Sequence, residues 1–285
     1  MKTFSISIIL ALLVGLTASV ASAARFVEEN FNYADATQLN GQMATATGLV
    51  ATNWTGWRSP SQIITYIDSL SYGSLLALYG QLSFDYPGYG NGDNARCLFT
   101  PGVATRINLS GTGAWYSVIL RTPPSNQANK SYKIRFDRGA YYDMYGVCLS
   151  NGYISSYVGS TYSASSGLLP ASTNLLVIFK IQRNSGTNYN VETWVYDDQV
   201  LPATPPVPGT GYAVTGGTTP SGGDVQALMF AMDTPGGSGQ ANAAALDEFR
   251  AGDTFADVTP VPEPAGLALL LPLLCLGLKV KGVRF

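Results

Sequence analysis

The sequence has no histidine among its 285 residues. Ser-His-Asp triads, Cys-His dyads and histidine-based metal sites are therefore excluded. Charged residues are also scarce, at 12% of the chain against a usual quarter. The chain has 16 Lys and Arg residues and 18 Asp and Glu residues, and four of the cations and one of the acids lie at the two ends. Residues 24–259 therefore hold 12 basic and 17 acidic residues, a net charge of −5. Nucleic-acid binding needs a basic footprint, so we expect no nucleic-acid partner.

The nearest thing to a basic block is a short stretch around residue 134. Its four cations are Lys130, Lys133, Arg135 and Arg138. They fit a β-strand whose alternate residues Tyr132, Ile134 and Phe136 face inward while the charges face outward. This stretch is therefore interpreted as a half-buried strand.

Helical periodicity is missing from the middle of the chain, whereas short apolar stretches bounded by Gly, Pro, Asn and Ser recur. We expect the loop 201–223, rich in proline and glycine, to cross one edge of the structure without forming a strand. Many short strands with turns between them predict an all-β, antiparallel β-sandwich over residues 24–258. The expected strands are Ala114–Arg121, Tyr132–Asp137, Tyr145–Leu149, Leu175–Gln182, Tyr189–Tyr196, Val225–Met232 and Ala244–Arg250.

Several stretches resemble the concanavalin A/LamG-like jelly-roll domains. Residues 29–33 resemble an opening strand, residues 111–116 a turn entering a core strand, and residues 175–182 and 191–196 a pair of central strands. Residues 245–252 and 254–258 resemble the closing strand. The resemblance implies two packed antiparallel sheets with the first and last strands adjacent. It implies no activity, because this fold carries many functions.

The first 23 residues have the pattern of a cleavable signal peptide. Lys2 precedes an uncharged apolar run, and Ala21 and Ala23 form a small-x-small cleavage site. We therefore expect an N-terminal signal helix, handling by the Sec translocon and signal peptidase, and a mature chain that begins near Ala24.

Residues 259–285 have the pattern of a short membrane-associated tail. The uncharged stretch 265–278 is followed by Lys279, Lys281 and Arg284 in the segment 279–285, an order that favours a cytoplasmic basic end. A helix of these 14 residues spans about 21 Å against a hydrocarbon core of about 30 Å, which suits a transient inner-membrane anchor.

The sequence Val261-Pro262-Glu263-Pro264 directly precedes that apolar run. The motif, the apolar stretch and the basic end together resemble the PEP-CTERM sorting domain of Gram-negative bacteria. The resemblance implies recognition by an exosortase, a membrane protease-transpeptidase, with loss of the tail and delivery of the mature form to the cell surface or medium. An ordinary tail anchor is the alternative.

Two cysteines, Cys97 and Cys148, remain once both ends are set aside. In an oxidising compartment they could form a disulfide, or they could be two small buried side chains in separate strands.

Three further groups of residues are candidates for ligand binding or catalysis. Trp54 and Trp57, with Tyr66 and Tyr72, could form an aromatic platform for sugar rings or belong to the core. Asp85 and Asp93 could contribute oxygens to a calcium ion, although a flexible turn is the simpler interpretation of residues 86–94, and no other metal or cofactor is expected. Asp247 and Glu248 are adjacent, so on a regular strand they would point to opposite faces and would not form a glycosidase pair.

These features predict an exported, non-catalytic cell-surface or matrix protein that contacts exopolysaccharide in a biofilm. A secreted glycan hydrolase or lyase and an inert structural spacer are the alternatives.

Overall fold

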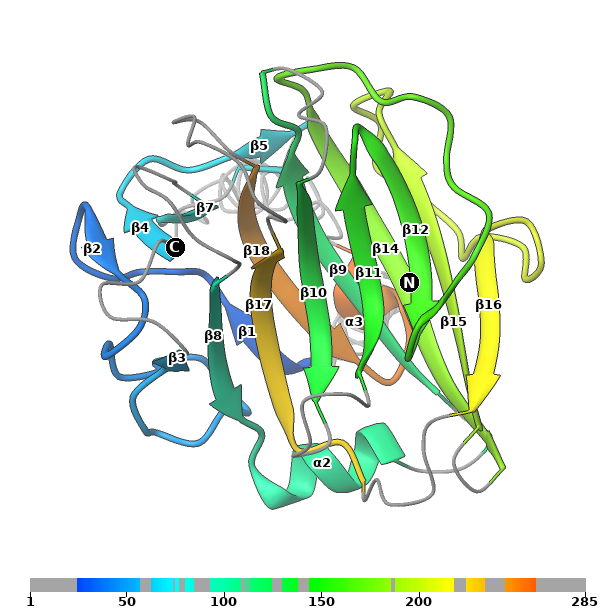
Figure 1. Ribbon diagram of the computed structural model, residues 1–285, viewed down its shortest axis with the longest axis horizontal. Coiled ribbons are helices and arrows are strands. Elements are labelled where there is room, and N and C mark those ends of the chain that lie inside the picture. The colour runs from blue at the N-terminus through cyan, green and yellow to red at the C-terminus, as the bar shows by residue number, and fades with distance from the viewer. Residues whose placement is uncertain are drawn as a thin grey trace, which may run out of the picture.

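Antiparallel strands make up more than half of the residues that the structure describes and form two sheets packed face to face, as the computed structural model shows (Figure 1). The structure describes residues 25–56, 63–73, 75–76, 80–84, 93–108, 111, 113–124, 130–137, 144–185, 188–217, 224–233 and 244–259. Signal-peptide and sorting-tail residues, including Ala21, Ala23, Val261, Pro262, Glu263, Pro264, Lys279, Lys281 and Arg284, lie outside these ranges, and so do the two expected terminal helices.

One sheet has nine strands and the other has seven. The nine-stranded sheet runs in the order β16 (Tyr212–Gly217), β15 (Asn188–Tyr196), β14 (Asn174–Ser185), β9 (Ala114–Arg121), β18 (Ala245–Gly252), β7 (Gln81–Phe84), β4 (Ile63–Tyr66) and β2 (Thr37–Gln38), with β1 (Arg25–Glu29) paired to β18. The seven-stranded sheet runs in the order β13 (Thr161–Tyr162), β12 (Tyr153–Val158), β11 (Met144–Ser150), β10 (Ser131–Asp137), β17 (Ala227–Asp233), β8 (Asp93–Leu98) and β3 (Thr55–Gly56).

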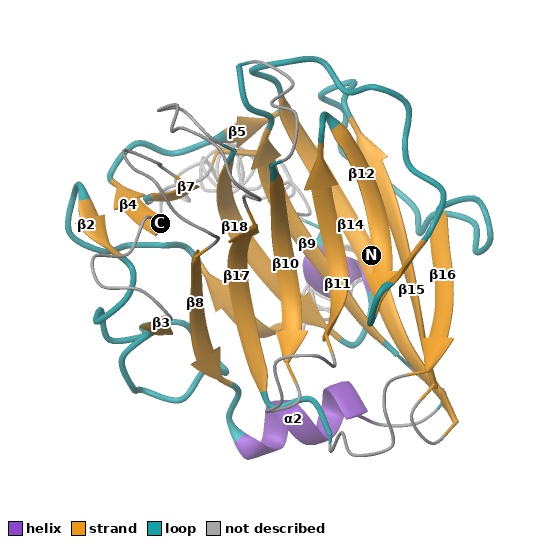
Figure 2. Ribbon diagram, in the orientation of Figure 1, coloured by secondary structure: helices purple, strands orange, loops and turns teal. Residues whose placement is uncertain are grey.

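The remaining described elements are small. A separate pair joins β5 (Ser71–Tyr72) to β6 (Leu75–Leu76). Helix α2 (Pro101–Asn108) lies along one end of the sandwich, and α3 (Phe255–Val258) follows the last strand (Figure 2). No helix in the described part of the chain is both long and apolar enough to cross a membrane.

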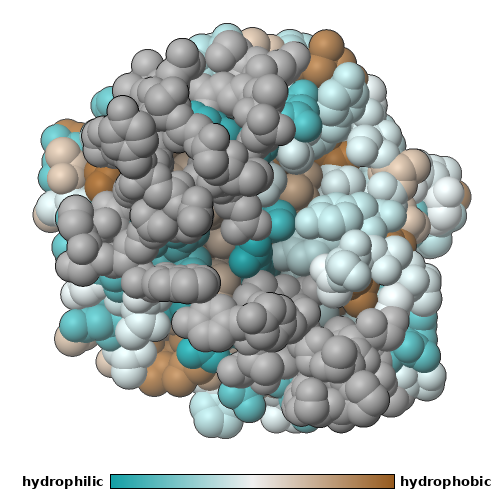
Figure 3. Space-filling view, in the orientation of Figure 1, coloured by the Kyte–Doolittle hydropathy of each residue, from teal (hydrophilic) through white to brown (hydrophobic). Residues whose placement is uncertain are grey.

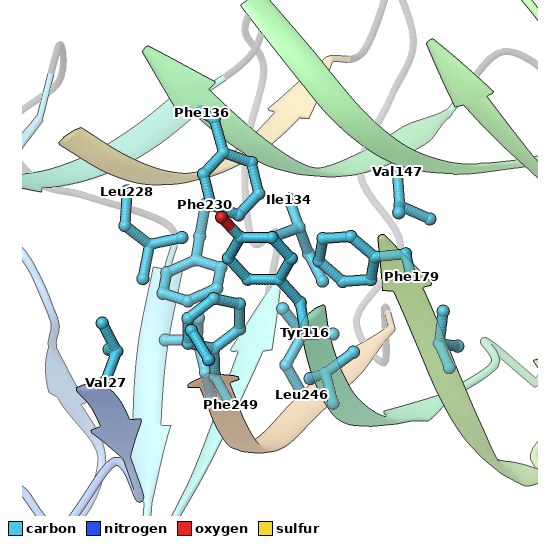
Figure 4. Close-up of a cluster of buried hydrophobic side chains, with 14 of the residues drawn as sticks. Val27, Tyr116, Ile134, Phe136, Val147, Phe179, Leu228, Phe230, Leu246 and Phe249 are labelled. Atoms are coloured by element: carbon cyan, nitrogen blue, oxygen red, sulfur yellow. The ribbon is translucent and has the colours of Figure 1, made fainter. Parts of the chain in front are cut away.

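Aromatic side chains from both sheets fill the space between them (Figure 4). The Tyr116 ring on β9 lies 4.7 Å from Phe136 on β10 and 4.9 Å from Phe179 on β14, measured between centroids. Phe249 on β18 contacts the same group, with its centroid 6.0 Å from that of Phe230 on β17. Alternation along each strand sends these rings inward, so the opposite set of side chains must face outward.

The two outer faces differ in what lies on them. The outer face of the nine-stranded sheet is covered by a second apolar cluster, which the loop before β5 and helix α3 complete: Leu70, Tyr72, Ile119, Leu176, Ile178, Ala245 and Phe255. β14 is therefore buried on both faces, which explains its unbroken apolar run. Among the described residues, the outer face of the seven-stranded sheet carries a small apolar cluster, formed by Cys148, Tyr157, Met229 and Ala231.

The predicted all-β antiparallel sandwich is confirmed, and all seven expected strands are present. The first and last strands also pair, with Glu28 opposite Arg250. The finer description of the fold as a jelly roll stays a prediction. The chain bends at Asp198 after β15, where Asp198 Oδ1 accepts a hydrogen bond from the Val200 N–H at 3.0 Å.

Four local predictions were wrong. The opening strand expected at residues 29–33 lies earlier, at Arg25–Glu29, and residues 30–33 form no strand. The loop 201–223 contains edge strand β16, which backbone hydrogen bonds to β15 stabilise without an apolar pattern. Helix α2 was not predicted, because its Pro101-Gly102 start resembles a turn. Residues 255–258 are helical instead of extended, because Asp257 accepts a hydrogen bond from the Thr254 N–H at 2.7 Å and so caps the first turn.

Candidate functional site

The candidate site lies on the outer face of the seven-stranded sheet. On β10, Tyr132, Ile134 and Phe136 are buried in the core, whereas Lys133 and Arg135 are half-buried on the opposite side. The predicted alternation of this strand is therefore confirmed. Figure 3 looks onto this face; its described surface is mostly pale to teal, and the hydrophobic brown areas are small and separate.

Strand register aligns the outward residues in rows across the sheet. One row crosses six neighbouring strands from β13 to β8, a distance of about 24 Å at the usual strand spacing. Its members, in order, are Tyr162, Tyr157, Gly146, Arg135, Met229 and Arg96. The row thus places aromatic side chains at one end and guanidinium groups at its middle and other end. We call the surface around Tyr157, Tyr162, Lys133, Arg135 and Arg96 the candidate face.

Two tyrosines and a lysine form the aromatic end of the candidate face. The rings of Tyr157 and Tyr162 stack with centroids 5.5 Å apart and an interplanar angle of 29°. Lys133 Nζ lies 5.7 Å from the Tyr157 centroid and 5.9 Å from the Tyr162 centroid, within cation–π range. Tyr157 is 2% exposed and Tyr162 is 47% exposed. The pair therefore presents one accessible ring, held in place by a buried one.

Glycine is required between the aromatic and basic ends. A Cβ added to Gly146 would lie 2.0 Å from the Ile134 carbonyl oxygen, and the residue has a φ of +151°. The row consequently has no side chain between Tyr157 and Arg135. Met229 and Ala231, which are buried on the neighbouring strand β17, continue the small apolar floor.

An ion pair orients the guanidinium group at the other end. Arg96 Nε donates to Asp137 Oδ2, and the exposed fraction is 27% for the Arg96 side chain and 6% for that of Asp137. The carboxylate thus lies beneath the arginine, and the cation is the more accessible partner.

Of the two alternatives for Trp54, a sugar platform or the core, the structure shows the core. This side chain is 1% exposed, and its ring centroid lies 5.7 Å from that of Phe230 in the core. Its Nε1–H donates to the Tyr33 hydroxyl at 2.9 Å, so the one polar atom of the indole is satisfied inside the protein. Tyr72 is also fully buried, and Trp57 lies outside the described residues.

Trp54 belongs to a buried chain of hydrogen bonds that runs through Tyr33 to Glu29. The Tyr33 hydroxyl donates to Glu29 Oε2 at 2.9 Å, and the Phe31 N–H donates to Glu29 Oε1 at 2.8 Å. Burial raises the pKa of Glu29 from 4.5 to about 7 and raises that of Tyr33 as well. Because Glu29 is 1% exposed, we assign this chain a structural role.

The possible Cys97–Cys148 disulfide is wrong: both residues are buried free thiols. Register places Cys97 on β8 opposite Leu228 and Cys148 on β11 opposite Lys133, with β17 and β10 between them. Three strand spacings separate their backbones by about 14 Å, and they lie on opposite faces of the sheet, so no disulfide can form.

The acidic pair on β18 is buried instead of pointing to two faces. A bulge follows Asp247, and Glu248 has a φ of +52°. Asp247 Oδ2 accepts from the Leu70 N–H at 2.8 Å, while Glu248 Oε2 accepts from Arg250 Nη2 at 2.7 Å. Burial raises the pKa of Asp247 from 3.8 to about 8. Asp247 therefore joins β18 to the loop before β5, whereas Glu248 pairs with Arg250 on its own strand, and both carboxylates are too buried to reach a substrate.

The speculative calcium site also lacks support. Asp93 is 3% exposed, and its Oδ1 accepts a hydrogen bond from the Asn94 N–H at 2.8 Å. Asp85 lies outside the described residues. Among the described residues, no group of three or more Cys, Asp or Glu side chains could hold a metal ion.

Sequence reasoning missed the aromatic end of the candidate face. Strands β12 and β13 were not predicted because Ser155 and Ser156 interrupt the apolar pattern. The alternation of Tyr153, Ser155 and Tyr157 on one side with Ile154 and Val158 on the other could have revealed β12.

A second aromatic group lies on the outer face of the nine-stranded sheet. The Trp115 centroid lies 5.6 Å from that of Trp194 and 5.5 Å from that of Phe255, and Lys180 Nζ lies 5.3 Å from the Trp115 centroid. This indole packs against the apolar cluster that covers the sheet, so we interpret it as structural.

No protein-family model and no curated protein matches the sequence. Among solved structures, a protein of unknown function from Shewanella oneidensis MR-1 is 16% identical, with 85% of this chain and 92% of that chain covered and a TM-score of 0.48. An endo-β-1,4-glucuronan lyase from Trichoderma reesei is 17% identical over 69% of this chain and 90% of its own, with a TM-score of 0.41. A Trypanosoma rangeli sialidase is 10% identical over 83% of this chain and 32% of its own, with a TM-score of 0.44.

Proposed function

We propose that this protein is an exported, non-catalytic cell-surface or matrix protein that binds extracellular polysaccharide through the candidate face. The observation that carries the proposal is the stacked pair of Tyr157 and Tyr162 beneath Lys133. A rigid, partly exposed phenol ring offers a flat apolar surface for the apolar face of a sugar, and its hydroxyl and the nearby ammonium group can bond sugar oxygens.

The two ends of the sequence support the proposed export and surface location. The signal-peptide pattern with Ala21 and Ala23 favours export, and the Val261–Pro264 motif before an apolar stretch and a basic end favours exosortase processing. A transiently anchored precursor would then yield a mature form at the cell surface or in the medium.

The acids described above support a binding role over hydrolysis. Glycoside hydrolysis by the usual route needs two carboxyl groups that flank the scissile bond. Among the described side chains of the candidate face, Asp137 is the one carboxylate, and it is bonded to Arg96. Asp247 and Glu248 are buried at the other sheet.

A polysaccharide panel tests the binding part of the proposal. The protein recovered from its producing cells would be passed over immobilised neutral and acidic polysaccharides, including those of the cells' own matrix. We expect retention on at least one of them and an altered biofilm in a deletion strain. No retention on any polysaccharide, together with an unchanged biofilm, would contradict the proposal.

The intact mass of the protein tests the proposed export and tail processing separately. The protein would be compared between a strain with exosortase and one without it. We expect a mass that ends near residues 261–264 in the competent strain alone, starting near Ala24. A C-terminus at Phe285 in both strains would indicate a simple tail anchor.

A further inference from the structure

The charge of the candidate face is opposite to that of the body. Residues 24–259 carry a net charge of −5, yet three cations and one anion are found among the described outward side chains of the seven-stranded sheet. The cations are Lys133, Arg135 and Arg96, and the anion is Asp137. Concentrating scarce cations on one face of an acidic protein favours an anionic ligand there.

The spacing of these cations suits a polymer more than a single ion. Lys133 and Arg135 are two residues apart on β10, so their backbones are separated by about 7 Å. Arg135 and Arg96 share a row and are separated by β17, which places their backbones about 10 Å apart. A ligand that crosses the strands can meet both guanidinium groups and the Tyr162 ring along one line.

We infer that the polysaccharide bound by this face is a carboxylated one, a chain of uronate residues lying along the row from Tyr162 to Arg96. This inference rests on the proposed function and adds the class of glycan. Guanidinium groups bind carboxylates through paired, charge-assisted hydrogen bonds, while Tyr162 supports a sugar ring beside them. Asp137 lies beneath Arg96 and is nearly buried, so its charge positions that arginine without standing in the path of the chain.

The direct test is a matched pair of ligands. The full chain would be titrated with a polyuronate and with the same polysaccharide after its carboxyl groups have been reduced to alcohols. We expect binding of the polyuronate to be about tenfold or more tighter and to weaken as salt rises, because charge-assisted bonds are lost on reduction and exposed charges are screened.

Four variants locate the effect. Lys133→Gln and Arg135→Gln should each weaken polyuronate binding about five- to thirtyfold while leaving the melting temperature within a few degrees of the parent. Arg135→Lys, which keeps the charge and loses the planar fork, should fall between Arg135→Gln and the parent. Lys180→Gln is the control, because Lys180 also lies over an aromatic ring but on the other sheet.

The possible outcomes separate the two proposals. Equal, salt-insensitive binding of both polymers would overturn the uronate inference and keep the proposed glycan binding. Binding of neither polymer, with retention on no other polysaccharide, would overturn both. Equally tight binding of a sulfated glycan or of single-stranded DNA would also overturn the inference, because it would show attraction to any polyanion. An unchanged affinity in Lys133→Gln and Arg135→Gln would place the site elsewhere.

Discussion

The ammonium group of Lys133 on β10 lies 5.7 Å from the centroid of the Tyr157 ring on β12, across the intervening strand β11. Between them, Gly146 carries no side chain and Cys148 is small and buried, so the lysine can extend sideways over the sheet. Its methylene stem covers apolar surface while its charged end stays near the tyrosines. This one contact joins the basic and aromatic parts of the candidate face.

We expect Tyr162→Ala to weaken polysaccharide binding about tenfold, because the exposed ring of the stacked pair would be lost. Its 47% exposure means that the melting temperature should change little. Isothermal titration of the recovered protein measures the first effect, and a thermal scan measures the second.

Tyr153→Ala is the matched control for that experiment. Tyr153 is 38% exposed, on the same outer face, and four residues before Tyr157 on β12, about 13 Å along the strand. Its loss should leave the affinity within twofold of the parent. Equal losses of affinity in the two variants would argue against a localised ring contact.

Trp54→Phe should destabilise the protein by about 2–4 kcal/mol without changing polysaccharide affinity. The substitution removes the donor to Tyr33 and leaves a small cavity beside Phe230. Urea unfolding followed by far-UV circular dichroism provides the measurement. A variant that is as stable as the parent but unable to bind glycan would show that Trp54 contacts the sugar.

Stability should fall as the pH rises through neutrality, because burial raises the pKa of Glu29 from 4.5 to about 7 and that of Asp247 from 3.8 to about 8. The folded protein holds these protons over a pH range in which the unfolded chain releases them. The stabilisation is complete below the unfolded values and is lost as the pH passes the folded ones.

Glu29→Gln isolates one of these contributions. The substitution should reduce the decline in unfolding free energy between pH 5 and pH 8 by up to about 3 kcal/mol. Glu28→Gln, a change to the half-buried neighbour, should leave the decline in place. Parallel pH profiles for the parent and Glu29→Gln would show that Glu29 is not buried as described.

Both Cys97 and Cys148 should react as free thiols once the protein is unfolded. Alkylation in denaturant without reductant should add two labels within residues 24–259, as read by peptide mass spectrometry. Little labelling is expected in the native state, since both side chains are 2% exposed. A peptide pair linked through these residues would contradict the separation of their strands.

Much of the fold could be predicted from the sequence because period-two patterning is strong where one face is buried. The alternation over Tyr132–Asp137 and the apolar run of β14 both identified their strands. Edge strand β16 and the short strand β13 were missed because backbone pairing with a neighbour stabilises them, and pairing leaves no pattern in a single segment. Helix α2 has eight residues, or about two turns, begins with proline and glycine, and so has little periodicity to detect.

The candidate site was much harder to predict than the sheets. Its cations were identified as outward-facing charges, but their alignment with Tyr157 and Tyr162 depends on the register of six strands that come from separate parts of the sequence. Trp54 was misplaced for a related reason, since only the fold shows that the Tyr33 hydroxyl lies within reach of its indole N–H.

The most direct test of the candidate face compares two lysines in one sample. The protein would be acetylated briefly with and without the bound polysaccharide, and the modification of Lys133 and Lys180 would be quantified by peptide mass spectrometry. Both side chains are half-buried, and each lies near an aromatic ring on a different sheet. We predict that the polysaccharide slows acetylation of Lys133 and leaves that of Lys180 unchanged. Protection of Lys180 with no protection of Lys133 would contradict the account.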